Sequence, residues 1–182
     1  MAFAVVSCEE PEPPTEFSAF EEAIDQTPAS KVKVATKITT ELGVLNSTVE
    51  TVFNPDGSAN INYTVQKFNS DFTSPEAVIT KSGAVTVNKD GSYSDGGQFQ
   101  GVLGENIAAV NLNLDAAKFE SYSIEGGILT ATVKAENTAS VFGAAIGADV
   151  SFMLTTSNNR VISVAINYTI AAGTVEAIVS YN

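Results

Sequence analysis

The stretch KVKVATKITTEL, residues 31–42, decides the fold class, because its more apolar and its charged side chains alternate. Six residues share the more apolar side: Val32, Val34, Thr36, Ile38, Thr40 and Leu42. The charged residues Lys33, Lys37 and Glu41 lie on the other side. Successive side chains of a β-strand point to opposite faces of its sheet. The stretch therefore predicts one long strand with a buried side and a solvated side.

The same alternation recurs on both sides of short turns. A strand at 48–53 runs into Asn54-Pro55-Asp56-Gly57, and an alternating stretch follows at 59–65. A second turn of this kind, Asn88-Lys89-Asp90-Gly91, separates a strand at 84–87 from one at 92–94. Asp-Gly between alternating stretches is a hairpin signal, so we expect two hairpins here.

The second half of the chain carries the remaining strands. We expect them at 108–114, 122–125, 128–134, 148–156, 161–169 and 174–181, with a short segment at 115–120. Gly126-Gly127, Asn158-Asn159 and Ala172-Gly173 form the turns between neighbouring strands. Connections this short favour antiparallel pairing. The polar stretch 98–106, with two glycines, predicts a loop.

Two stretches predict helices. Within 15–27 the apolar residues follow helical spacing and acidic residues occupy the opposite side. The apolar residues are Phe17, Phe20, Ala23 and Ile24. Thr15 suits the helix start, and Pro28 suits its end. A second helix is expected at 136–142, where Gly143 and Gly147 limit its length.

Together these elements predict a mainly β protein of the α+β type. We expect a large curved antiparallel sheet or half-barrel of nine or ten strands, with two short helices on one face. The chain has 182 residues, of which 44% are hydrophobic and 16% charged. This composition is typical of a folded domain, so residues 16–182 should form a single β-rich domain.

The charge balance excludes some classes of function. The formal net charge is -12, from 21 acidic and 9 basic residues, and Arg160 is the only arginine. Nucleic-acid binding needs clustered basic side chains, so we expect no nucleic-acid partner. Histidine is absent, which removes the commonest general base and the commonest metal ligand. We therefore expect no enzyme activity, no catalytic residues, no cofactor and no metal site.

The N-terminus points to an address outside the cytoplasm. The apolar run from Phe3 ends in Ser7, directly before Cys8, the only cysteine of the chain, and an acidic, Pro-rich stretch follows. Val5-Val6-Ser7-Cys8 resembles the lipobox of bacterial lipoproteins, which implies that the Cys8 thiol carries diacylglycerol. The alternative is a free cysteine in a leader.

The lipobox resemblance also divides the N-terminal segment. The run before Cys8 is shorter than the apolar core of a signal peptide, so we expect residues 1–7 to be a signal-peptide remnant. Residues 8–15 would be an acidic, Pro-rich tether. The protein would then be exported and anchored to a membrane of the bacterial cell envelope through lipid on Cys8.

The order of the elements carries a second resemblance. A lipobox, a tether, a helix, long antiparallel strands, a helical excursion and a closing meander resemble the LolA-like lipoprotein carriers, including the LppX and LprG type. The resemblance implies a half-barrel that holds acyl chains on one face, under the helices. The ligand-lining residues would then be Phe17, Phe20, Ile24, Val34, Ile38, Phe142, Ile146, Ile166 and Tyr168.

Two functions follow as hypotheses. The first is a cell-envelope lipoprotein that binds or carries a lipid or another hydrophobic molecule. The second is a non-catalytic structural lipoprotein of the bacterial surface, which contacts a protein or a glycan. For the aromatic residues we expect ordinary core packing, with ligand contact as the alternative, and for 88–95 a plain hairpin turn, with a calcium loop as the alternative.

Overall fold

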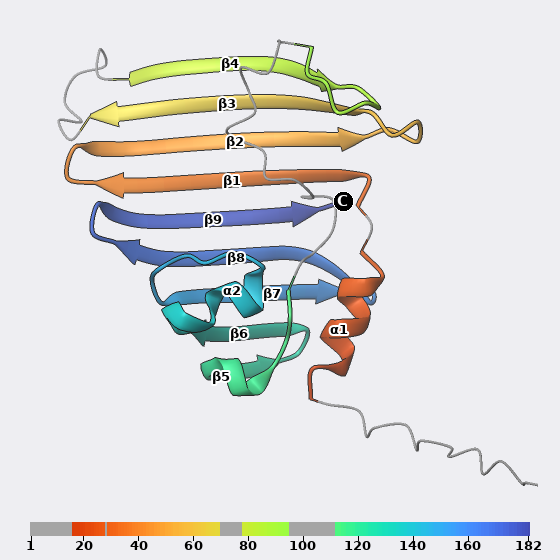
Figure 1. Cartoon of the computed structure of the whole chain (residues 1–182), viewed down its shortest axis with the longest axis vertical. Helices are drawn as coiled ribbons and strands as arrows, with labels where there is room; N and C mark the ends of the chain where they lie inside the picture. Colours follow the sequence, from red (N-terminus) through yellow and green to blue (C-terminus); the bar gives the residue numbers. More distant parts are fainter. Residues whose placement is uncertain (1–15, 28, 70–77, 95–111) are drawn as a thin grey trace, which may run out of the picture.

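The computed structural model describes residues 16–27, 29–69, 78–94 and 112–182. In this part of the chain, nine strands form one curved, open antiparallel sheet, a half-barrel, in the order β4-β3-β2-β1-β9-β8-β7-β6-β5 (Figure 1). The strands are β1 Lys31–Thr40, β2 Gly43–Phe53, β3 Ala59–Asn69, β4 Val78–Val87, β5 Phe119–Glu125, β6 Ile128–Val133, β7 Val150–Ser157, β8 Arg160–Ile170 and β9 Gly173–Tyr181. The predicted fold class is confirmed.

Two meanders make up this sheet. Strands β1 to β4 form the first and strands β5 to β9 the second, and the two are joined where β1 pairs with β9. We call this pairing the seam. Its register runs from Val32 opposite Tyr181 to Thr39 opposite Thr174. The first and last strands of the chain therefore lie side by side in the middle of the sheet (Figure 1).

Both helices lie on the same face of the sheet, which we call the inner face (Figure 1). Helix α1, Ser18–Asp25, packs against β8, and helix α2, Thr138–Phe142, lies over the β6–β7 part of the sheet. Directly opposed residues of antiparallel strands share a face. One inner row therefore crosses six strands through Leu129, Leu154, Val164, Val179, Val34 and Val49.

The first helix is shorter than predicted. Its N-cap is Phe17, and its C-cap is Gln26. Thr27 lies just beyond the helix, and its hydroxyl serves two groups: it donates to the carbonyl oxygen of Ala23 and accepts from the amide of Val161 at 2.8 Å. This side chain ties the end of α1 to the start of β8. The expected cap Thr15 lies outside the described residues.

The second helix is confirmed but is split. A 3-10 turn, Ala135–Asn137, precedes the five residues of α2. Gly143 ends the helix with a left-handed φ of 71°, a conformation that glycine adopts without strain. The glycine that was expected to limit the helix is thus its C-cap.

Several strand bounds differ from prediction: β2 starts at Gly43, β4 at Val78 and β5 at Phe119, each earlier than expected. Leu42 was expected on the buried side of the first strand, but β1 ends at Thr40 and Leu42 is 83% exposed in the two-residue turn to β2. Residues 92–94 form only one bridge, between Tyr93 and Val87. Residues 112–114 form no strand. The expected loop at 98–106 and residues 108–111 lie outside the described residues.

The last turn was placed one residue too late. Gly173 belongs to β9, and the turn consists of Ala171 and Ala172. Gly173 has a φ of 150°, and a Cβ atom on it would overlap the carbonyl oxygen of Thr39 across the seam. This close backbone approach of β1 and β9 explains why a glycine starts the strand.

Candidate ligand-binding face

The helix-covered part of the inner face is a filled core. Helix α1 contributes Phe20 and Ala23, α2 contributes Val141, and all three are buried. Strands β6, β7 and β8 supply the other wall, with Leu129, Ala131, Val133, Phe152, Leu154, Val161 and Val164. Aromatic rings close the ends in edge-to-face pairs, such as Phe142 on Phe152 at 5.5 Å between centroids.

Five of the predicted ligand-lining residues meet in this core. They are Phe17, Phe20, Ile24, Phe142 and Ile166. Phe17 and Phe20 are buried, at 3% and 4% exposure, and the other three are partly buried against them. Ile146 is half-buried in the loop after α2, where its amide donates to the Thr138 hydroxyl at 3.0 Å. Whether any of these residues contacts a ligand stays a prediction.

The other three predicted residues lie at the seam and beside it. Tyr168 on β8 is opposite Val175 on β9, which is opposite Ile38 on β1, which is opposite Leu45 on β2. Val34 lies on the same face of β1, two rows away, with the row of Thr36 in between. The register therefore brings Ile38 and Tyr168 within two strands of each other, although 130 positions separate them in sequence, 168 minus 38. Ile38, Tyr168 and Leu45 are half-buried.

The inner rows at the seam carry no charge. On β8, β9 and β1 the inner positions hold only aliphatic, aromatic and hydroxyl residues. The charged residues of these strands point the other way: Lys37 pairs with Glu176 at 3.4 Å on the outer face, and Lys31 pairs with Glu50 at 3.0 Å. These exposed pairs contribute little stability, but they show the polarity of the two faces.

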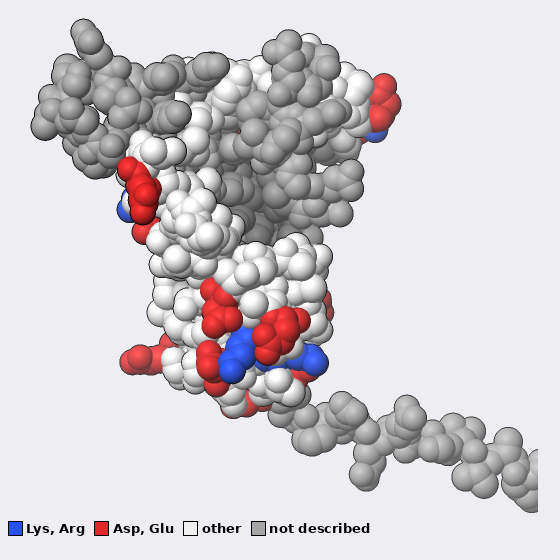
Figure 2. All heavy atoms as spheres, turned by 60° about the vertical axis from the view of Figure 1, so that its left-hand side comes forward, with Lys and Arg blue, Asp and Glu red and all other residues white. Residues whose placement is uncertain are grey.

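Charged side chains also gather at one end of the sheet. Figure 2 shows acidic and basic groups together at the lower end, where β5 and β6 lie in Figure 1, and few above them at the level of β8 and β9. Lys134 pairs with Glu120 there at 3.4 Å.

A second, smaller cluster lies on the inner face of β2, β3 and β4. Val49, Ile61 and Val85 are buried there, with Tyr63 against them. Gly83 leaves room for the Tyr63 ring, because a Cβ at this position would lie 2.5 Å from the Tyr63 hydroxyl oxygen. Thr51 in this region is 2% exposed, and its hydroxyl has no hydrogen-bond partner among the described residues.

The expected hairpin turns explain the carboxylates that suggested calcium. The Asp90 carboxylate accepts from the Ser92 amide at 2.9 Å and from the Ser92 hydroxyl at 2.6 Å. Asp56 and Ser58 make the same two bonds in the first turn. These bonds hold the pKa of each aspartate below its usual value. Asp95 lies outside the described residues, and within the described ranges no three acidic side chains lie close enough together to hold a metal ion.

Sequence reasoning missed two features. Met153 and Ile178 occupy outer-face positions yet are apolar, and they border a shallow depression of about 290 Å³ with Ala165 between them. The sequence contained a signal for this depression, because apolar residues stand at positions that the strand alternation assigns to the solvent-facing side. Arg160, the second feature, lines a pocket beside the end of α1.

The described part of the chain contains no helix that is both long and apolar enough to cross a membrane. Cys8 and the expected tether lie outside the described residues, so lipidation stays a prediction.

No family model matches the chain, and no curated protein matches it. Among solved structures, LprF from Mycobacterium bovis is 12% identical, with 89% of this chain and 90% of that chain covered and a TM-score of 0.42. The redesigned β-barrel mFAP1 bound to DFHBI is 14% identical, with 88% and 99% covered and a TM-score of 0.23.

A third structure is the dehydratase domain from the CurK module of curacin polyketide synthase. It is 8% identical, with 90% of this chain and 77% of that chain covered and a TM-score of 0.23. At these TM-scores, none of the similarities bears on function.

Proposed function

We propose that the chain is a non-catalytic binding or carrier domain that holds a lipid or another hydrophobic molecule on its inner face. One observation carries the proposal: the uncharged inner rows continue from the helix-covered strands across the seam onto β1 and β2. Binding sites for apolar molecules are lined mainly by such side chains.

The site would centre on the row of Tyr168, Val175, Ile38 and Leu45. Of the two helices that the structure describes, neither lies over β1 or β2 (Figure 1). The free energy of the protein falls when another layer removes the apolar side chains of a sheet face from water. An acyl chain supplies such a layer without requiring polar partners.

The proposal includes the location. The lipobox resemblance at Cys8 supports export and a lipid anchor in a bacterial cell envelope, with residues 8–15 as a tether. Mass spectrometry of the natively expressed protein tests this part. A diacylglycerol mass on the peptide that contains Cys8 is expected, and an unmodified thiol in the exported protein would contradict it.

Two neighbouring positions on β1 test the ligand site. Ile38 is an inner-face residue and Thr39 an exposed outer-face residue, so Ile38→Asp and Thr39→Asp add the same charge to opposite faces. Protein purified from a bacterial host should carry lipid-mass adducts in native mass spectrometry. Ile38→Asp should reduce adduct occupancy about 10-fold, because an unpaired carboxylate is costly beside an acyl chain.

Thr39→Asp should leave the adducts unchanged. Ile38→Ala provides a milder variant, and circular dichroism confirms that each protein is folded. Equal adducts in both aspartate variants, or a wild-type protein without adducts, would contradict a lipid site on the inner face.

One observation supports a second candidate function, a surface protein that contacts another protein. Met153 is 40% and Ile178 49% exposed, and both border the outer depression. Contiguous exposed apolar side chains mark interaction surfaces. In-cell crosslinking from a photoreactive residue at position 153 should then capture a partner protein, and the Ile178→Lys substitution should abolish this crosslink. If position 153 crosslinks to no protein, this function is contradicted.

A further inference from the structure

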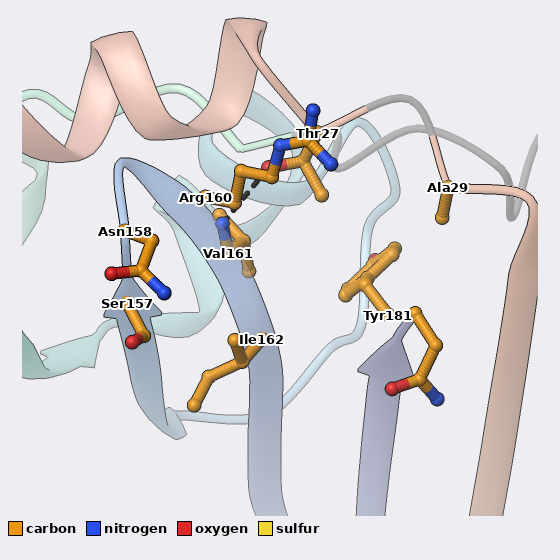
Figure 3. A pocket seen from close by; sticks show the side chains of 9 residues that line it. Thr27, Ala29, Ser157, Asn158, Arg160, Val161, Ile162 and Tyr181 are labelled. Atoms are coloured by element: carbon orange, nitrogen blue, oxygen red, sulfur yellow. Dashed lines mark hydrogen bonds between the residues drawn. The ribbon is translucent and has the colours of Figure 1, made fainter.

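A pocket of about 390 Å³ opens at the end of the sheet, between the end of α1, the β7–β8 turn and the last residues of the chain (Figure 3). The side chains that matter here are Thr27, Ser157, Asn158, Arg160, Ile162 and Tyr181. They come from three segments that are distant in sequence: the end of α1, the β7–β8 turn with the start of β8, and the end of β9. The β7–β8 turn is tight: both Asn158 and Asn159 have positive φ, as a two-residue hairpin turn requires.

Arg160 gives this pocket a charge opposite to that of the protein. It is the only arginine in a chain with a net charge of -12, and no Asp or Glu is among the residues that line the pocket. The ion pairs of the described residues use Lys31, Lys37 and Lys134. The Arg160 guanidinium thus has no carboxylate partner in the part of the chain that the structure describes.

The neutral polar groups of the pocket are also available. Within the described ranges, the side chains of Ser157, Asn158 and Tyr181 make no hydrogen bond. Burial raises the pKa of the Tyr181 hydroxyl, which therefore stays protonated. Thr27 differs, because its hydroxyl is used between Ala23 and Val161 and belongs to the wall.

A purely structural role for Arg160 is the competing explanation. Figure 3 shows its side chain extending towards Thr27, just beyond the C-terminal end of α1. A cation at a helix C-terminus is favourable, but the effect is small for an exposed side chain and is screened by salt. This role accounts for the direction of the side chain. It does not account for a pocket with three unpartnered polar side chains and no Asp or Glu side chain.

We propose that this pocket binds a small molecule with an oxyanion, a carboxylate or a phosphate monoester, attached to a compact apolar group. A guanidinium presents a fork of donors that matches two oxygens of such an anion. Val161, Ile162 and the Tyr181 ring supply the apolar walls. The site is separate from the Ile38–Tyr168 row, so it does not depend on the proposed function.

The test is a ligand titration of the full chain. Binding is monitored through the amide signals of Val161 and Ile162 in nitrogen–proton correlation spectra. The titrants are benzoate, phenyl phosphate, inorganic phosphate and benzyl alcohol, at constant ionic strength. Benzoate or phenyl phosphate should shift these signals, whereas benzyl alcohol, the uncharged match, should bind at least about 5-fold more weakly. Inorganic phosphate tests the need for the apolar group.

Variants separate the pocket from the overall charge. Arg160→Gln should weaken binding of the aromatic anion about 5- to 10-fold, and Arg160→Lys should weaken it less, because the charge remains without the fork. Lys33→Gln is the matched control: it removes the same charge from the exposed outer face of β1 and should leave binding unchanged. Asn158→Gly keeps the positive φ of the turn and should weaken binding about 2-fold.

Three outcomes would overturn the proposal. These are no shift with either aromatic anion, equal binding of benzyl alcohol, and equal losses in Arg160→Gln and Lys33→Gln. If Arg160→Gln fails to fold, the Arg160→Lys and Asn158→Gly variants decide the question in its place.

Discussion

The helix-covered region, β6 to β8 under α1 and α2, and the region of β1 and β2 use the same alternation of residues with different results. Leu129 and Leu154 are fully buried in the first region, whereas Val34, Ile38 and Leu45 occupy inner positions in the second and are only half-buried, although Val32 and Val49 of the same two strands are buried. Alternation makes one face of a sheet apolar, but the depth to which each side chain on that face is buried depends on what packs over it.

The same substitution in the two regions gives the largest expected contrast. Leu154→Ala should lower the free energy of unfolding by about 4 kcal/mol, because it leaves a cavity among closely packed side chains, and Leu45→Ala by about 1 kcal/mol. Urea denaturation monitored by circular dichroism measures both. Similar losses would show that the two regions are equally well packed and would remove the contrast.

The seam joins the two regions, and Gly173 is its tightest point. Gly173→Ala should cost about 3 kcal/mol, since the new methyl group overlaps the Thr39 carbonyl and the φ of 150° disfavours any side chain. Gly57→Ala is the control: its φ is also positive, at 88°, but no atom lies within 4 Å of the added carbon. Equal thermal shifts in the two variants would mean that backbone conformation, not the seam, sets the cost.

Thr27 attaches α1 to the covered region through one hydroxyl. Thr27→Val should cost about 2 kcal/mol, because the buried amide of Val161 loses its acceptor while the side chain keeps its shape. Thr27→Ser should retain most of the stability. Hydrogen exchange at Val161 checks the cause, and unchanged protection of this amide in Thr27→Val would contradict it.

A substitution of Thr51, on the inner face of β2, should stabilise the protein instead of destabilising it. Its buried hydroxyl has no partner among the described residues, so Thr51→Val should raise the free energy of unfolding by about 1 kcal/mol. Thr51→Ser keeps the hydroxyl and removes a methyl group, and should be destabilising. A loss of stability in Thr51→Val would show that the hydroxyl has a partner.

The Asp-Gly turns at 54–57 and 88–91 should give the smallest effect on stability, and this effect should be seen only at acidic pH. The pKa of Asp56 and Asp90 is lowered in the folded state, so their contribution is present above the unfolded pKa and is lost as the pH falls through the folded pKa. The double variant Asp56→Asn and Asp90→Asn should therefore lose slightly less stability between pH 5 and about pH 2 than the wild type. If the double variant and the wild type had the same pH profile, the two aspartates would have the same pKa in the folded and the unfolded state, and the prediction would be wrong.

Prediction from sequence succeeded where neighbouring residues decide the outcome. Asn158-Asn159 and Asn88 to Gly91 predicted their turns, and Gly143 predicted the end of a helix, because these conformations depend on local backbone geometry. Leu42 shows the limit. Its alternation continued the strand, but the two-residue turn that starts at Glu41 placed it in solvent. Arg160 had no local signal, because its pocket is assembled from three separate segments.

The sequence by itself determined a mainly β domain with two short helices and one apolar side to each long strand, because strand periodicity and turn residues act over a few positions. Tertiary structure alone decided that β1 pairs with β9, that the helices cover β6 to β8, and that Ile38 and Tyr168 share an uncharged row. These arrangements depend on which strands meet and on what covers them, and periodicity contains no information about either.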